Sequence, residues 1–111
     1  MPDQSDVRRL ALAQPEATEE PHHERTSFRV RGKIFATFQP GSDAANLALP
    51  PELALEVVDR ESGVSPINWG SIKGWVRLDL ADVREGLLEQ LIPAAWSRVA
   101  PKRLQQARTV A

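Results

Sequence analysis

The side chains best suited to binding chemistry in this sequence are six basic residues and one tryptophan near two turns that contain glycine. Residues 22–37 carry four of these bases against one acid, and the other two flank the tryptophan further along the chain. Clustered arginine and lysine side chains can neutralise phosphate groups, and a neighbouring aromatic ring can stack on a base or pack against a protein. The candidate nucleic-acid-binding residues are Arg25, Arg29, Arg31, Lys33, Lys73, Trp75 and Arg77.

These residues also have a simpler interpretation, in which they solvate an exposed sheet and pair with acidic side chains on neighbouring strands. The net charge of the chain is −1, so binding to DNA is expected to be weak and sensitive to salt. No expected helix begins with residues that read base edges, so contact with DNA should be largely independent of its sequence. A protein or small ligand bound on the same face, around Trp75, is the alternative.

Signals for metal binding and catalysis are weak. The chain has no cysteine, which excludes disulfides and thiolate ligands. One stretch of acids and histidines looks like a metal site, but adjacent histidines on a strand point to opposite faces and cannot easily share an ion. It comprises Glu16, Glu19, Glu20, His22, His23 and Glu24. No serine lies in a nucleophile-elbow motif and the glycines are isolated turn residues, so we expect a non-enzymatic protein without cofactor or metal.

Length and composition indicate a single domain. The 111 residues, of which 41% are hydrophobic and 26% charged, suffice for one core over residues 1–111, with residues 1–4 and 109–111 as loose tails. No apolar run approaches the roughly 20 residues needed to cross a bilayer, so no membrane partner is expected. The first residues lack the pattern of a signal peptide, and we therefore expect a cytoplasmic protein.

A β-hairpin over residues 27–38 is the clearest element, because apolar and polar side chains alternate on both sides of Gly32. A two-residue turn would place Lys33 on the apolar face, so we predict a three-residue turn over residues 31–33. The side chains predicted to face the core are Phe28, Val30, Ile34, Ala36 and Phe38. Those predicted to face outward are Ser27, Arg29, Phe35 and Thr37.

The helices are predicted from apolar spacing and capping residues. The first should begin at the N-cap Ser5 and end at Pro15, and a second should open near residue 50, where proline is tolerated in the first turn. A third is predicted from Asp82, which forms a capping box with Glu85, and its apolar spacing continues across Pro93 to residue 99. A last helical turn is expected over residues 102–107.

The remaining strands are expected around this hairpin. One lies within residues 16–24 and ends in a turn at Pro21, and others cover residues 45–49, 64–67 and 75–80. A second basic turn is expected over residues 69–74. Sheet strands with one apolar face need helices to cover only that face.

Several stretches resemble the motifs of one family. Residues 27–36, SFRVRGKIFA, resemble the P-S-F-R-V-x-G-K-I-F-A core of MmcQ/YjbR proteins. Residues 73–76, KGWV, are similar to the K-x-G-W-V strand entry of that family, and residues 95–104 resemble its C-terminal helix. The resemblance to the MmcQ/YjbR family extends over residues 5–108, which is nearly the whole chain.

The resemblance implies an α+β fold of the CyaY-like type, a two-layer sandwich in which helices cover one face of an antiparallel sheet. It also implies a DNA-binding role, which is attributed to the family because two of its hairpins are arranged like a pair of wings. We therefore expect phosphate contacts at the hairpin tips and on the open face of the sheet.

Overall fold

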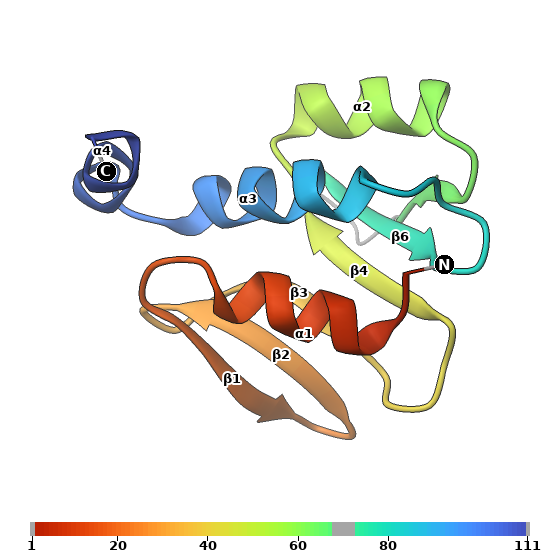
Figure 1. The fold of residues 1–111 in the computed structure, drawn as a ribbon, viewed down its shortest axis with the longest axis horizontal. Coiled ribbons are helices and arrows are strands. Elements are labelled where there is room, and N and C mark those ends of the chain that lie inside the picture. The colour runs from red at the N-terminus through yellow and green to blue at the C-terminus, as the bar shows by residue number, and fades with distance from the viewer. Residues whose placement is uncertain (1, 68–72, 111) are drawn as a thin grey trace.

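A computed structural model gives the structure of residues 2–67 and 73–110 (Figure 1). Within these ranges the helices are α1 (Gln4–Leu12), α2 (Pro51–Arg60), α3 (Leu87–Val99) and α4 (Lys102–Val110). The strands are β1 (Ala17–His22), β2 (Arg25–Val30), β3 (Lys33–Phe38), β4 (Ala44–Ala48), β5 (Val64–Pro66) and β6 (Trp75–Asp79). No helix among these residues is both long and apolar enough to span a membrane.

The strands form one antiparallel sheet in the order β1-β2-β3-β4-β6-β5. Helices α1 and α3 lie side by side across one face of the sheet, and α2 packs near the edge formed by β5 and β6 (Figure 1). The predicted α+β fold, a two-layer sandwich covered on one face, is therefore confirmed. The opposite side of the sheet, which we call the open face, is left without a covering helix among the described residues.

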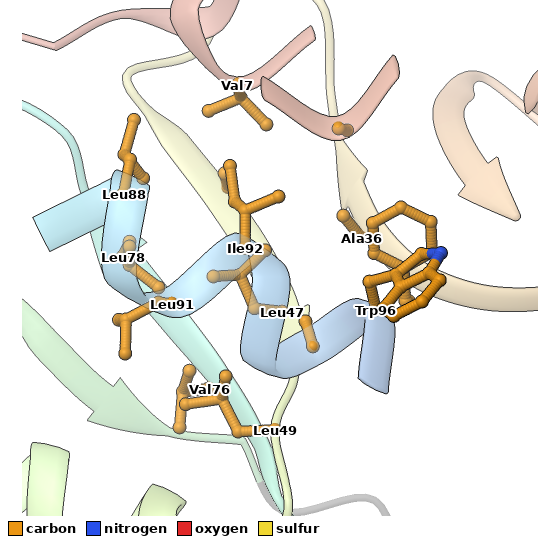
Figure 2. Packing of buried hydrophobic residues seen from close by; sticks show 14 of the residues in the cluster. Val7, Ala36, Leu47, Leu49, Val76, Leu78, Leu88, Leu91, Ile92 and Trp96 are labelled. Carbon is orange, nitrogen blue, oxygen red and sulfur yellow. The ribbon is translucent and has the colours of Figure 1, made fainter. Parts of the chain in front are cut away.

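The core lies between the sheet and its two covering helices (Figure 2). Ile92 and Trp96 of α3 point toward Leu47 of β4 and Ala36 of β3, and all four side chains are buried. The indole nitrogen of Trp96 donates a hydrogen bond to the carbonyl of Pro15, 2.9 Å away, so even this polar atom is satisfied. Helix α3 runs through Pro93, as the apolar spacing predicts.

Two predicted helix starts are wrong. Asp3, not Ser5, caps α1, because its carboxylate accepts from the Asp6 amide and the Asp6 carboxylate accepts from the Asp3 amide. Residues 3 and 4, which we expected in a loose tail, thus belong to the start of this helix. Helix α3 begins after Gly86 rather than at Asp82, whose side chain instead accepts a hydrogen bond from the Ser62 hydroxyl at 2.7 Å.

Strand β1 also departs from expectation at Pro21. This proline lies inside the strand opposite Thr26 and does not form the turn. Proline is tolerated there because β1 is the edge of the sheet, where a missing amide costs no hydrogen bond to a further strand. The turn follows at residues 23–24, with His23 at a φ of 58°.

The turn between β2 and β3 has two residues, so the predicted three-residue turn is wrong. Arg31 and Gly32 adopt φ values of 51° and 83°, as in a tight primed hairpin turn, and Val30 pairs with Lys33. The register then shifts, because Phe28 pairs with Ala36 whereas Arg29 pairs with residue 34. This shift makes residue 35 the extra residue of a β-bulge.

The bulge exchanges the sides predicted for two neighbouring residues. Phe35 is completely buried rather than outward, and Ile34 is half-buried on the open face opposite Arg29. The other four predicted core residues of the hairpin, Phe28, Val30, Ala36 and Phe38, are buried as expected. A bulge therefore reconciles a tight turn with an apolar core face, which simple alternation cannot do.

Candidate functional site on the open face

A row of polar side chains crosses the open face. The row contains one residue from each of the six strands, and each of these residues is paired with the row's residue on the neighbouring strand. The row therefore spans the whole sheet. It consists of Glu20, Ser27, Thr37, Asn46, Arg77 and Ser65. Polar side chains gathered on the uncovered side of a sheet can meet a ligand without disturbing the core.

The centre of this row is buried and hydrogen-bonded. Ser27, Thr37 and Asn46 are each almost inaccessible to solvent. The Ser27 hydroxyl donates to the Glu20 carbonyl at 2.7 Å, and the Asn46 amide donates to the Thr37 hydroxyl at 3.3 Å. These lateral bonds hold the floor of the open face in one arrangement.

Beside the row, the open face is hollowed into a depression of about 690 Å³. Its walls come from the β1–β2 turn, from β3 and β4, and from the start of β6. The lining residues are His22, His23, Glu24, Arg25, Ile34, Thr37, Gln39, Asn46 and Trp75. A smaller hollow next to it is lined in part by Arg25, Asn46 and Arg77, so the two arginines approach the same asparagine.

Four of the seven predicted binding residues lie on this face. Arg25 and Arg77 are exposed, and Trp75 is half-buried on the wall of the depression. Arg29 is half-buried, and its Nε donates to the Ser27 hydroxyl at 3.0 Å. One terminal nitrogen of Arg29 also lies 3.4 Å from Nδ1 of His22, so its guanidinium is held against the sheet.

The other three predicted residues lie at one end of the sheet. Arg31, in the β2–β3 turn, forms an ion pair with Glu16 across 3.3 Å. Strands β3 and β6 run in the same direction, because both are antiparallel to β4. Lys33 is the first residue of β3 and Lys73 lies just before β6, so the two lysines lie at the same end of the sheet. Both lysines are exposed. None of these three residues lines the depression or the smaller hollow beside it.

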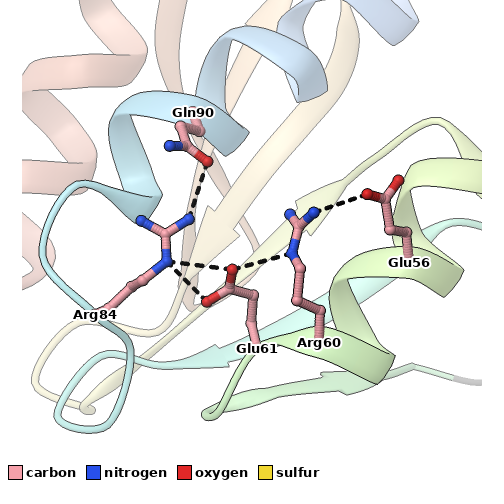
Figure 3. A network of polar contacts seen from close by, with 5 residues as sticks. All are labelled: Glu56, Arg60, Glu61, Arg84 and Gln90. Carbon is pink, nitrogen blue, oxygen red and sulfur yellow. Dashed lines mark hydrogen bonds and ion pairs between the residues drawn. The ribbon is translucent and has the colours of Figure 1, made fainter.

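Four arginines on the helix side of the molecule, Arg8, Arg9, Arg60 and Arg84, are paired with acids, unlike those of the open face. Arg84 and Arg60 both contact the Glu61 carboxylate, and Arg60 also reaches Glu56 at 2.7 Å (Figure 3). The hydrogen bond from Arg84 is the largest cause of a lowered pKa at Glu61. By contrast, Arg25, Arg29 and Arg77 form no ion pair with any residue described by the structure.

Two residues that hold the start of β6 in place, Arg98 and Gly74, were not among the predicted site residues. Arg98 of α3 donates to the carbonyls of Leu49 and Lys73. Gly74 has a φ of 92°, and a β-carbon there would clash with the Leu49 carbonyl and the Arg98 guanidinium. The glycine before Trp75 was a visible signal in the sequence, but its contact partner is 25 residues away along the chain.

The two histidines of the depression were also placed wrongly. Because His23 lies in the turn and not in the strand, its ring is brought to 4.8 Å from the ring of His22 rather than to the opposite face. In the ranges 2–67 and 73–110, no three histidine or acidic side chains gather closely enough to hold a metal ion. The pair adds two imidazole rings to the wall of the depression.

Comparison with known proteins identifies the family. The YjbR family model matches residues 12–98. A Deinococcus radiodurans protein with a DUF419 domain has a similar fold, with a TM-score of 0.72, 22% identity, and coverage of 86% of this chain and 77% of its own. A Pseudomonas syringae protein gives a TM-score of 0.67 at 15% identity, with 90% of this chain and 100% of its own covered.

At sequence identities of 22% and 15%, the two solved structures support only a shared fold. A search of the curated proteins found no match. The family match, however, spans most of the chain and includes the hairpin, the strand that carries Trp75 and all but the last residue of helix α3. The chain therefore belongs to the YjbR family.

Proposed function

We propose that this protein binds nucleic acid through phosphate contacts on its open face, and that the two hairpin tips contribute less. The observation that carries the proposal is that Arg25, Arg29 and Arg77 lie on the uncovered side of the sheet, the face that also carries Trp75. A guanidinium group without a carboxylate partner is available to a phosphate, which it can bind through two parallel hydrogen bonds. We propose further that the protein acts by binding and not by catalysis.

The details of the face favour a backbone-directed, sequence-independent contact. Trp75 supplies an aromatic wall on which a base can stack, whereas the buried Phe35 cannot contribute to this surface. The open face is made of strands, and no helix within residues 2–67 and 73–110 projects from it to enter a major groove. Acidic residues at its margins, Glu20 and Glu24, oppose an anionic ligand and keep the expected affinity low.

The wing arrangement is less well supported. Arg31, the base at the centre of the first tip, already forms an ion pair with Glu16. A phosphate would have to displace that carboxylate, and exposed ion pairs of this kind contribute up to about 1 kcal/mol. We therefore assign the main contact to the open face.

The test is a salt titration of binding to a fluorescein-labelled 20-nucleotide DNA strand, followed by fluorescence anisotropy. For a single strand the logarithm of affinity falls with the logarithm of salt by about 0.7 per phosphate contacted. The double variant Arg25→Ala/Arg77→Ala should therefore bind more weakly and reduce the slope by about 1.4. The matched control, Arg9→Ala/Arg60→Ala, removes the same charge from the helix side and should leave the slope unchanged.

Two results contradict the proposal. If the helix-side variant loses as much affinity as the open-face variant, only net charge is being measured. If Arg31→Ala/Lys33→Ala reduces the slope and Arg25→Ala/Arg77→Ala does not, the contact lies at the hairpin tip and the wing arrangement is correct.

A second candidate function is the binding of a protein segment or small ligand in the same depression. The observation that favours it is the lining itself, which combines the apolar Ile34 and Trp75 with the polar Asn46 and Gln39. Such binding should be insensitive to salt and should depend on the side chain of Trp75. An affinity for DNA that falls steeply with salt would argue against it.

A further inference from the structure

A second surface, separate from the polar row of the open face, lies between α2 and the edge strand β5. It is a groove of about 290 Å³ with mainly apolar walls. One wall is α2 and the other is the end of β5 with the start of β6. The lining residues of α2 are Pro51, Ala54, Leu55 and Val58, and those opposite include Pro66 and Ile67.

Helix α2 carries more apolar surface than the core uses. Val57 and Ala54 are buried against the sheet, as in any amphipathic helix. Residues 51, 55 and 58, which share the next face of a helix with 3.6 residues per turn, form a second apolar stripe along the groove. Leu55, in the middle of this stripe, is 76% exposed. A leucine exposed to this extent on a groove wall is apolar surface that no described residue covers.

The charges around the groove specify what would cover it. The residues directly after the apolar stripe, Glu52, Glu56 and Asp59, form an acidic stripe on the solvent side of α2. Glu56 is held by Arg60 at 2.7 Å, whereas Glu52 and Asp59 form no ion pair within the described part of the chain. The outer lip of the groove, along α2, is therefore negatively charged, and its acids outnumber the one cation among the described lining residues, Lys73 on the opposite wall.

We propose that this groove binds a basic amphipathic helix of a partner protein. Its apolar side chains would pack on Leu55 and Val58, and its lysines or arginines would face Glu52 and Asp59. A strand added to the sheet edge fits less well, because β5 has three residues, Pro66 has no amide hydrogen, and the Ile67 amide already bonds to the Trp75 carbonyl at 3.0 Å.

This inference does not depend on the proposed nucleic-acid binding. Trp75 lines both the groove and the depression of the open face, so it is left unchanged in the test. Leu55 is the appropriate residue to change, because it lines only the groove and its exposed side chain contributes little to the core. Its substitution should leave the fold intact.

The test uses a labelled 14-residue amphipathic helix built from leucine and lysine as the probe, with binding followed by fluorescence anisotropy at moderate salt. Leu55→Ser should weaken binding by about tenfold or more, since it removes a large apolar contact. The matched control is Leu12→Ser, which changes the exposed leucine of α1 (42% exposed) and should have no effect. Glu52→Gln/Asp59→Asn should weaken binding severalfold. The matched control, Asp43→Asn/Glu89→Gln, replaces two exposed acids away from the groove that likewise form no ion pair among the described residues, and it should have no effect.

The outcomes separate the components of the proposal. A leucine–glutamate peptide of the same pattern should bind at least about tenfold more weakly, because the acidic stripe repels it. Equal losses for Leu55→Ser and Leu12→Ser would overturn the groove, and equal binding of the two peptides would overturn the basic partner. Concentration-dependent dimerisation that Leu55→Ser abolishes would also overturn the proposal, because the occupant would then be a second copy. Circular dichroism and thermal unfolding of each variant exclude loss of folding as the cause.

Discussion

The bulge in β3 predicts that two adjacent apolar residues make very different contributions to stability. Phe35 is completely buried, whereas Ile34 is half-buried on the open face. Removing a buried phenylalanine side chain leaves a cavity, and Phe→Ala changes in protein cores cost about 3–5 kcal/mol. Phe35→Ala should fall within this range, since no part of its side chain is exposed. Ile34→Ala should cost roughly 1 kcal/mol, because its side chain already meets solvent and leaves no closed cavity.

Equilibrium unfolding in urea measures this difference. Proteins of this size lose about 1–3 kcal/mol of unfolding free energy per molar urea, so a loss of about 4 kcal/mol moves the midpoint by about 2 M. Ile34→Ala should move it by about 0.5 M under the same conditions. Circular dichroism and tryptophan fluorescence should report the same midpoint if unfolding is two-state.

The reversed order of the two variants would refute the assigned register. Strict alternation through a three-residue turn places Ile34 in the core and Phe35 on the surface, so it predicts the larger loss for Ile34→Ala. Similar losses in both variants would mean that the strand is not bulged as described. Thr37→Val provides a control for the open face, because it removes the hydroxyl that accepts a hydrogen bond from Asn46 without altering the apolar side of the strand.

Three further predictions concern Gly74, Glu61 and Trp75. Gly74→Ala should destabilise the fold by about 2 kcal/mol or more in urea unfolding, because φ is 92° and the Leu49 carbonyl blocks a β-carbon, whereas Gly32→Ala meets no neighbouring atom and should cost about 1 kcal/mol. The pKa of Glu61 is lowered from its ordinary value of 4.5, so its contribution to stability is present above that pH and is lost as the pH falls through the lowered pKa. Glu61→Gln should therefore lower the urea midpoint near pH 7, and its difference from the unchanged protein should shrink in acid; a constant difference would contradict this. Trp75→Leu should weaken binding of a 20-nucleotide strand by about 1–3 kcal/mol but leave the salt dependence unchanged, and equal loss for an abasic strand would exclude base stacking.

The sequence alone was sufficient for the family, the fold class and most of the core. Alternation over residues 27–38 correctly predicts Phe28, Val30, Ala36 and Phe38 as buried, and helical spacing correctly predicts that the third helix continues across Pro93. These features depend on the local periodicity of strands and helices, which is written directly in the order of apolar residues. Alternation also places four of the seven candidate binding residues in two pairs. Arg25 and Arg29 share one side of β2, and Trp75 and Arg77 share one side of β6.

Only the tertiary structure decided how the candidate residues are grouped. Alternation cannot show that β3 gains an extra residue at Phe35, because a bulge forms when a strand and its neighbour must satisfy both a tight turn and a shared core. The ion pair of Arg31 with Glu16 and the contacts of Arg98 with the segment before Trp75 join residues far apart in the chain. Such contacts depend on how the elements pack, so their partners could not be read from spacing along the chain. The basic hairpin was therefore visible in the sequence, but packing determined that its tip is partly neutralised and that the available arginines lie on the open face.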